Sequence, residues 1–129
     1  MNAPPTITTS PSTTGHVVVT VAGDHDLDTA DDLRQQLFEA IGTNPQVVLD
    51  LSRMTFCDSV CLGVLVSSHQ AAVSAGGWLR VAAPGTYIRR VLDLTRLDQV
   101  LSIHDSLEEA VRPSVEAPAV PEQRGADSA

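Results

Sequence analysis

Residues 56–66 read Phe-Cys-Asp-Ser-Val-Cys-Leu-Gly-Val-Leu-Val, and this stretch decides how the rest of the chain is organised. An apolar, β-branched run at residues 47–51 comes before it and is typical of a buried strand. Apolar residues recur at helical spacing after it, which predicts a helix over about 58–74. Asp58-Ser59 therefore places a small hydroxyl at or just after a helix N-cap. Backbone N–H groups are unpaired there and the helix dipole favours negative charge, so the position suits a phosphate.

The Asp58-Ser59 pair also has a purely structural interpretation. Asp and Ser are among the residues that helices prefer at their N-caps, so the spacing alone indicates a cap and nothing more. Support for a function of Ser59 has to come from other parts of the sequence.

Strand and helix patterns alternate on both sides of this stretch. Strands are expected at residues 16–22, 46–51, 78–82 and 100–103, with a short edge strand around Ile7 and a break at residues 23–26. Helices are expected from a cap at Asp28 or Thr29 to Gly42, at 58–74, at 86–94, and from a cap at Asp105 or Ser106. The alternation predicts an α/β domain with a mixed central sheet of about four to five strands, covered by about four helices.

Size and composition narrow the class of protein. A chain of 129 residues fits one domain, and its core must be aliphatic because 43% of residues are hydrophobic but only 3% aromatic. A net charge of −8 argues against a nucleic-acid-binding surface, which requires clustered basic residues. The N-terminus lacks the basic and apolar regions of a secretory signal, and no apolar run is long enough to span a membrane. We therefore expect a cytoplasmic protein.

The two ends differ in composition from the middle of the chain. We expect residues 1–6 to be a flexible N-terminus and residues 7–112 to form the domain. Residues 113–129 are rich in Pro, Ala and acidic residues and contain few large apolar side chains. Such a tail cannot bury enough surface to offset its ordering entropy, so we expect it to be disordered.

The two cysteines, Cys57 and Cys61, flank the Asp-Ser pair. Their spacing fits neither a disulfide framework nor a Cys-x-x-Cys redox motif, and His69 is the only nearby additional metal ligand. We expect both to be small buried hydrophobic residues, with no metal site and no cofactor. A redox-sensing thiol is the alternative.

Several motifs together resemble the signature of a known family. Asp50-Leu51-Ser52, Phe56, Asp58-Ser59 and Leu62-Gly63-Val64-Leu65 are similar to the signature of the anti-sigma factor antagonists, the single-domain STAS proteins of bacterial partner switching. Residues 23–30 resemble the family's Gly-Glu-apolar-Asp block, with Asp24 in place of Glu. Residues 91–98 resemble its Leu-x-Leu-Thr-Gly-Leu stretch, with Arg96 in place of Gly. The resemblance covers residues 7–112 and implies a single STAS domain.

The resemblance also implies roles for individual residues. Ser59 matches the family's phosphoacceptor, and the residues expected to bind a partner are Asp24, Asp26, Asp58, Ser59, Val60 and Leu62. Three positions depart from the family: His25 replaces an apolar residue, and Val60 and Cys61 replace a Ser or Thr followed by Gly. We expect His25 to be an exposed or partly buried loop histidine.

The resemblance implies a switch in transcription regulation and not an enzyme. The unphosphorylated protein would bind an anti-sigma factor serine kinase with an ATPase-like fold and so free a sigma factor. The kinase would then phosphorylate Ser59 and end the binding, and a PP2C-type phosphatase would reset the switch. The protein would act as a monomer or weak dimer, without contacting nucleic acid or membrane directly.

Two other functions compete with the switch. Relatives of the family serve as interaction modules in stress-signalling scaffolds or lipid-transport complexes, which have no sigma-factor role and do not need a phosphoacceptor. An enzyme with Ser59 as nucleophile is the other. However, the Gly-x-Ser-x-Gly elbow is absent, and His69 lies about 15 Å along the helix, too far to act as the base.

Overall fold

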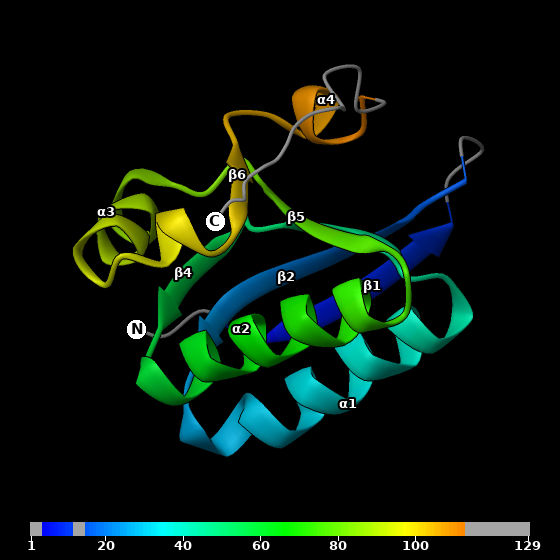
Figure 1. Cartoon of the computed structure of the whole chain (residues 1–129). Helices are drawn as coiled ribbons and strands as arrows, with labels where there is room; N and C mark the ends of the chain where they lie inside the picture. The colour runs from blue at the N-terminus through cyan, green and yellow to red at the C-terminus, as the bar shows by residue number, and fades with distance from the viewer. Residues whose placement is uncertain (1–3, 12–14, 113–129) are drawn as a thin grey trace.

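The computed structural model describes residues 4–11 and 15–112 (Figure 1). The expectations for the outermost N-terminal residues and for the tail at 113–129 lie outside the described residues. The elements in order are β1 (Thr6–Pro11), β2 (Val17–His25), α1 (Leu27–Thr43), β3 (Gln46–Asp50), β4 (Met54–Cys57), α2 (Ser59–Ser74), β5 (Trp78–Ala82), α3 (Thr86–Leu94), the 3-10 turn η1 (Leu97–Gln99), β6 (Ser102–His104) and α4 (Leu107–Ala110). None of the described helices is both long and apolar enough to cross a membrane.

The strands form one mixed sheet. Five of them lie in the order β1-β2-β3-β5-β6, and β4 pairs with β2 off this path. β1 runs antiparallel to β2, whereas the other pairs are parallel. The structure confirms the α/β class, the mixed sheet and the helices, with one strand more than the sequence predicts.

α1 and α2 lie side by side across one face of the sheet and enclose the main core (Figure 1). Alternate residues of the central strands point into this core, as the twofold period of a strand requires. Val19 and Val21 of β2, Leu49 of β3 and Val81 of β5 are completely buried there. The core is aliphatic, as the composition indicates.

α4 covers part of the opposite face of the sheet. Val48 of β3 and Ala82 of β5 alternate with the core-facing residues and pack instead against Ala110 of α4. This second cluster is small because α4 contributes a single turn. The C-terminal end of the described chain therefore needs a further anchor.

Arg80 of β5 supplies that anchor. Its side chain is buried, and its guanidinium carbon lies 3.8 Å from the centre of the Trp78 ring. Its Nη1 group donates to the carbonyl oxygens of Ala110 at 3.1 Å and Arg112 at 2.7 Å. A buried cation is thus paired with carbonyl groups that the end of α4 leaves without helical partners.

β4 forms in a segment, residues 52–57, for which the sequence predicted no strand. β2 also continues to His25, beyond the break predicted at residue 23, and its last residues are the partners of β4. The pairing register shifts between Gly23 and Asp24, which is how the chain passes the predicted break. Gly23 has φ +86°, and a Cβ there would lie 2.1 Å from the Pro4 carbonyl oxygen, so only glycine fits.

The predicted cap of α1 was also wrong by two to three residues. Asp26 is the N-cap, and its carboxylate accepts the Asp28 N–H at 2.9 Å. The Thr29 hydroxyl accepts the Asp26 N–H at 3.0 Å and completes a capping box. The caps predicted at Asp58 and Ser106 are confirmed.

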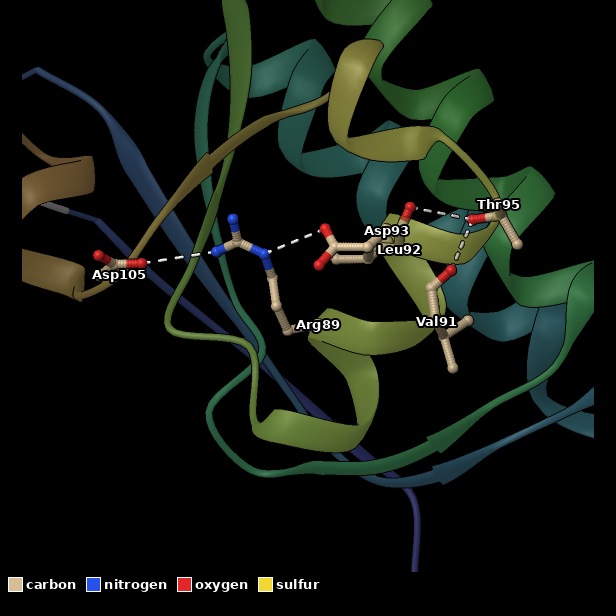
Figure 2. Close-up of polar contacts among 6 residues, drawn as sticks. All are labelled: Arg89, Val91, Leu92, Asp93, Thr95 and Asp105. Atoms are coloured by element: carbon tan, nitrogen blue, oxygen red, sulfur yellow. Dashed lines mark hydrogen bonds and ion pairs between the residues drawn. The ribbon is translucent and has the colours of Figure 1, made fainter.

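Figure 2 shows the polar contacts of α3. Arg89 lies 3.3 Å from the Asp93 carboxylate and 3.5 Å from that of Asp105, which precedes α4. The Thr95 hydroxyl donates to the Val91 carbonyl oxygen at 2.7 Å and closes the last turn. These ion pairs are exposed, so each contributes no more than about 1 kcal/mol.

Arg80→Met should lower the free energy of unfolding by about 2 kcal/mol, because it leaves the Ala110 carbonyl group buried without its charged donor. The same change at exposed Arg89 is the control and should cost less than about 1 kcal/mol. Urea unfolding followed by far-ultraviolet circular dichroism measures both. An Arg80→Met protein as stable as the Arg89→Met protein would contradict the anchor.

Candidate functional site

The candidate site lies where β2 and β4 end together. The two strands are parallel and their last residues, His25 and Cys57, are in register. Each strand is followed at once by an aspartate and a helix, so the N-termini of α1 and α2 emerge next to each other. The Asp58 N–H donates to the His25 carbonyl oxygen at 3.2 Å and holds the two ends together.

Ser59 is the first residue of α2 and is exposed. The Asp58 carboxylate caps the helix by accepting the Cys61 N–H at 3.0 Å. The prediction of a hydroxyl just after the N-cap is therefore confirmed. An added phosphoryl group at Ser59 would meet both the free N–H groups of the first turn and the carboxylate of Asp58.

Asp24 and Asp26 lie on the neighbouring end of β2. The Thr55 hydroxyl of β4 donates to the Asp24 carboxylate and fixes its direction. Asp26 is engaged as the N-cap of α1. With Asp58, both carboxylates are half-buried, so this end of the molecule carries three partly shielded negative charges beside the exposed Ser59.

Leu62 and the cysteines lie beneath this surface. Leu62 is only 8% exposed and belongs to the main core, so it offers little area to a partner. It packs α2 against the core instead. Cys57 and Cys61 are buried free thiols, which confirms the expectation for both. Burial raises the pKa of Cys57 to about 12 and that of Cys61 to about 11, so both thiols are protonated at neutral pH.

The expectation for His25 was wrong. It is completely buried at the end of β2 and is not a loop residue. Its Nε2 lies 2.9 Å from the Ala22 carbonyl oxygen, which can only accept, and its Nδ1 lies 3.3 Å from the Thr29 hydroxyl. His25 thus links the end of β2 to the capping box of α1, and it has no exposed surface with which to contact another molecule.

Four large apolar side chains are exposed around these strand and helix ends, and we call them the apolar rim. They are Leu27 (68% exposed), Phe56 (39%), Val60 (42%) and Tyr87 (52%). Tyr87 comes from α3 and stacks on Phe56, with ring centres 6.5 Å apart. Only Val60 was predicted to bind a partner. The signal for Tyr87 was available in the sequence, because it is one of few aromatic residues and lies outside the apolar stripe of its helix.

The candidate site is an exposed surface around Ser59. Three hollows within residues 4–11 and 15–112 are lined by other residues, and one of them, a groove of about 450 Å³, lies between β1 and α1. No three His, Cys, Asp or Glu side chains within residues 4–11 and 15–112 are grouped to hold a metal ion. Such a surface suits a protein partner better than a small substrate.

Comparison with known proteins identifies the family. The sequence matches the family described as "Mlab, STAS domain" over residues 9–109. The anti-sigma-F factor antagonist RsfB of Mycobacterium tuberculosis is 32% identical over 113 residues, which cover 86% of this chain and 92% of RsfB. The crystal structure of an anti-sigma factor antagonist from Mycobacterium paratuberculosis has a TM-score of 0.77 at 31% identity, covering 86% of this chain and 96% of that one. Two Thermotoga proteins, 35% and 36% identical over 66 residues, are matched over 58% of their own length.

The fold, with two helix N-termini side by side at the end of a mixed sheet, is that of a STAS domain. The chain belongs to the anti-sigma factor antagonist family of STAS proteins, as the sequence motifs predict. Anti-sigma factor antagonists are regulators without catalytic activity, in agreement with the expectation that the chain is not an enzyme.

The buried thiols predict a loss of stability in alkali. Since folding raises both pKa values above the ordinary value of about 9, the thiols favour the folded state fully below pH 9. This contribution is lost as the pH rises from about 9 to about 12, because the thiols ionise first in the unfolded chain. The chain has no lysine, so few other groups titrate in that range.

Urea unfolding at pH 8 and pH 10.5 tests this dependence. The Cys57→Ala/Cys61→Ala protein is the control and should lose less stability between the two pH values than the wild type. Equal losses of stability in the wild type and the control would show that the thiols have the same pKa in the folded and unfolded states.

Proposed function

We propose that this protein is a phosphorylation-controlled anti-sigma factor antagonist. Its unphosphorylated form binds an anti-sigma factor and frees the sigma factor, and phosphorylation of Ser59 ends the binding. The observation that carries this function is the position of Ser59. It is exposed at the first residue of α2, directly after the capping Asp58 and directly before the exposed Val60.

The apolar rim is an argument for a protein partner. Exposed aromatic and aliphatic side chains that gather at one end of a small protein are typical of the central part of an interface. Phe56 and Tyr87 stiffen each other by stacking, which lowers the entropy that they would lose on binding. Asp24 and Asp26 at its edge would pair with basic groups of the partner and orient it.

A single phosphoryl group on Ser59 can end the binding of such a partner. It adds about −1.5 to −2 charges next to Asp58 and close to Asp26. A partner that closes over Ser59 must then desolvate that charge and bring its own groups against a more negative surface. In the free protein, the N–H groups at the start of α2 favour the same charge, so phosphorylation changes binding more than stability.

The anti-sigma factor is proposed to be the kinase. It would transfer the terminal phosphoryl group of its ATP to the Ser59 oxygen, and the hydroxyl proton would pass to a base of the kinase. A PP2C-type phosphatase would hydrolyse the phosphoester and restore the binding form. The exchange would take place in the bacterial cytoplasm, with the protein as a monomer or weak dimer.

A STAS interaction module without a sigma-factor role is the second candidate. The match to the family described as "Mlab, STAS domain" over residues 9–109 supports it, because that description names a STAS domain and no sigma factor. Such a module would use the apolar rim in the same way but would bind its partner whatever the state of Ser59. The response to substitution of Ser59 therefore separates the two functions.

Ser59→Ala should bind the anti-sigma factor as tightly as the unphosphorylated wild type and should not be released by ATP and Mg²⁺. Ser59→Asp should bind at least about tenfold more weakly, because a charge occupies the phosphate position. Isothermal titration calorimetry with the purified anti-sigma factor gives the affinities, and intact-mass spectrometry counts the phosphoryl groups. Equal affinities for the wild type, Ser59→Ala and Ser59→Asp would overturn the switch.

Val60→Ala should weaken binding of the anti-sigma factor about fivefold, because it removes apolar area from the centre of the interface. Val73 is the matched control: it lies on α2, is 52% exposed, and is about 20 Å further along the helix axis. Val73→Ala should bind like the wild type. A weaker interaction with the Val73→Ala protein alone would move the interface away from Ser59.

A further inference from the structure

The thiol of Cys61 joins the caps of two helices. Cys61 is the third residue of α2, and its N–H is the group that the Asp58 cap accepts. Its Sγ donates to the carbonyl oxygen of Asp26, the cap of α1, at 3.3 Å. One residue therefore contacts Asp58 through its backbone and Asp26 through its side chain, across 35 positions of sequence.

The Asp26 carbonyl oxygen, which accepts the hydrogen bond from the Cys61 thiol, also takes part in the other contacts of the α1 cap. It also accepts the Thr29 N–H at 3.0 Å and lies 3.2 Å from the Thr29 hydroxyl. A change in its direction would disturb the capping box of α1. Motion of the first turn of α2 is thus coupled to the first turn of α1.

The thiol is present as a donor at neutral pH. Burial raises the pKa of Cys61 to about 11, so the S–H group is retained. Cys61 is completely buried, so water does not compete for the contact. A thiol is a weak donor, but it is small enough to fill the space between two closely packed helix ends.

We propose that Cys61 is a positioning residue that ties the N-terminal ends of α1 and α2 together and thereby fixes Ser59 relative to Asp26. This inference rests on the proposed function only for the meaning of Ser59, because the link itself belongs to the free protein. Without it, the first turn of α2 would open more often, and the Ser59 hydroxyl would be presented to a kinase in several directions. Phosphoryl transfer depends on such alignment.

Three proteins separate the link from mere packing. Cys61→Ala removes the donor and little volume, whereas Cys61→Ser restores a donor but buries a more polar group. If Cys61 only fills space, the helix ends of the Cys61→Ser protein should be as stable as those of the Cys61→Ala protein, or less stable. If the hydrogen bond to Asp26 matters, they should be more stable. Cys57→Ala is the matched control, because Cys57 is also buried. Its thiol donates to the carbonyl oxygen of adjacent Asp58, at 3.7 Å, and interacts with the Cys61 thiol, so the variant removes a buried thiol but leaves the Cys61–Asp26 contact in place.

Amide hydrogen exchange of the full chain, without a partner, is the first readout. The Leu62 N–H donates to the Asp58 carbonyl oxygen at 3.0 Å and reports on α2, and the Thr29 N–H reports on α1. Cys61→Ala should speed exchange at both amides about fivefold, and Cys61→Ser should recover most of the difference. Cys57→Ala should leave Thr29 unchanged. Faster exchange at Leu62 alone, or a serine protein no better than the alanine protein, would overturn the link.

The kinetics of Ser59 phosphorylation by the purified anti-sigma factor kinase are the second readout. Cys61→Ala should lower kcat about fivefold with little change in KM, because the binding surface is intact and only the alignment of Ser59 is lost. Unchanged kcat despite faster exchange would show that the link does not position Ser59. Absence of phosphorylation in the wild type would instead overturn the proposed function, while hydrogen exchange would still decide on the link.

Discussion

The pairing of β4 with the last residues of β2 is the constraint on which the functional end of this protein depends. Because the two strands are parallel and end in register, the segments that follow them must start at the same edge of the sheet. Each segment begins with an aspartate that caps a helix, so two helix N-termini lie next to each other. A single pairing thus brings Asp26 and Ser59, which are distant in sequence, into one surface.

The contacts beneath that surface are polar and at least partly buried. His25 is hydrogen-bonded through both ring nitrogens, to the Ala22 carbonyl and the Thr29 hydroxyl. Cys61 bridges the two caps, and the Asp58 N–H is bound to the end of β2. Buried polar groups tolerate little displacement, because each lost partner costs about 1–3 kcal/mol. The first turns of α1 and α2 are therefore held together by several hydrogen bonds beneath the exposed side chains.

The rest of the molecule depends on contacts that are less specific about which side chains form them. The aliphatic core beneath α1 and α2 needs only apolar side chains of suitable size at alternate strand positions. On the other face, α4 is a single turn and depends on Arg80 for its attachment. The end of the sheet that carries Ser59 and the C-terminal end of the described chain therefore rest on different interactions, so a substitution at one end should leave the other end intact.

The sequence by itself determined the α/β class, the aliphatic core, and a hydroxyl beside the cap of α2. These follow from periodicity and capping preferences, which act between residues close in the chain. Motifs within residues 50–65 were also enough to indicate the family. Only the tertiary structure decided that β4 exists, that Asp26 caps α1, that His25 is buried and that Tyr87 joins Phe56 at the surface. The β4 pairing and the Phe56–Tyr87 stack join residues about 30 positions apart. The contacts of Asp26 and His25 are local, but both positions follow from the continuation of β2 to His25, through a bulge at Gly23 that local patterns indicated as a break.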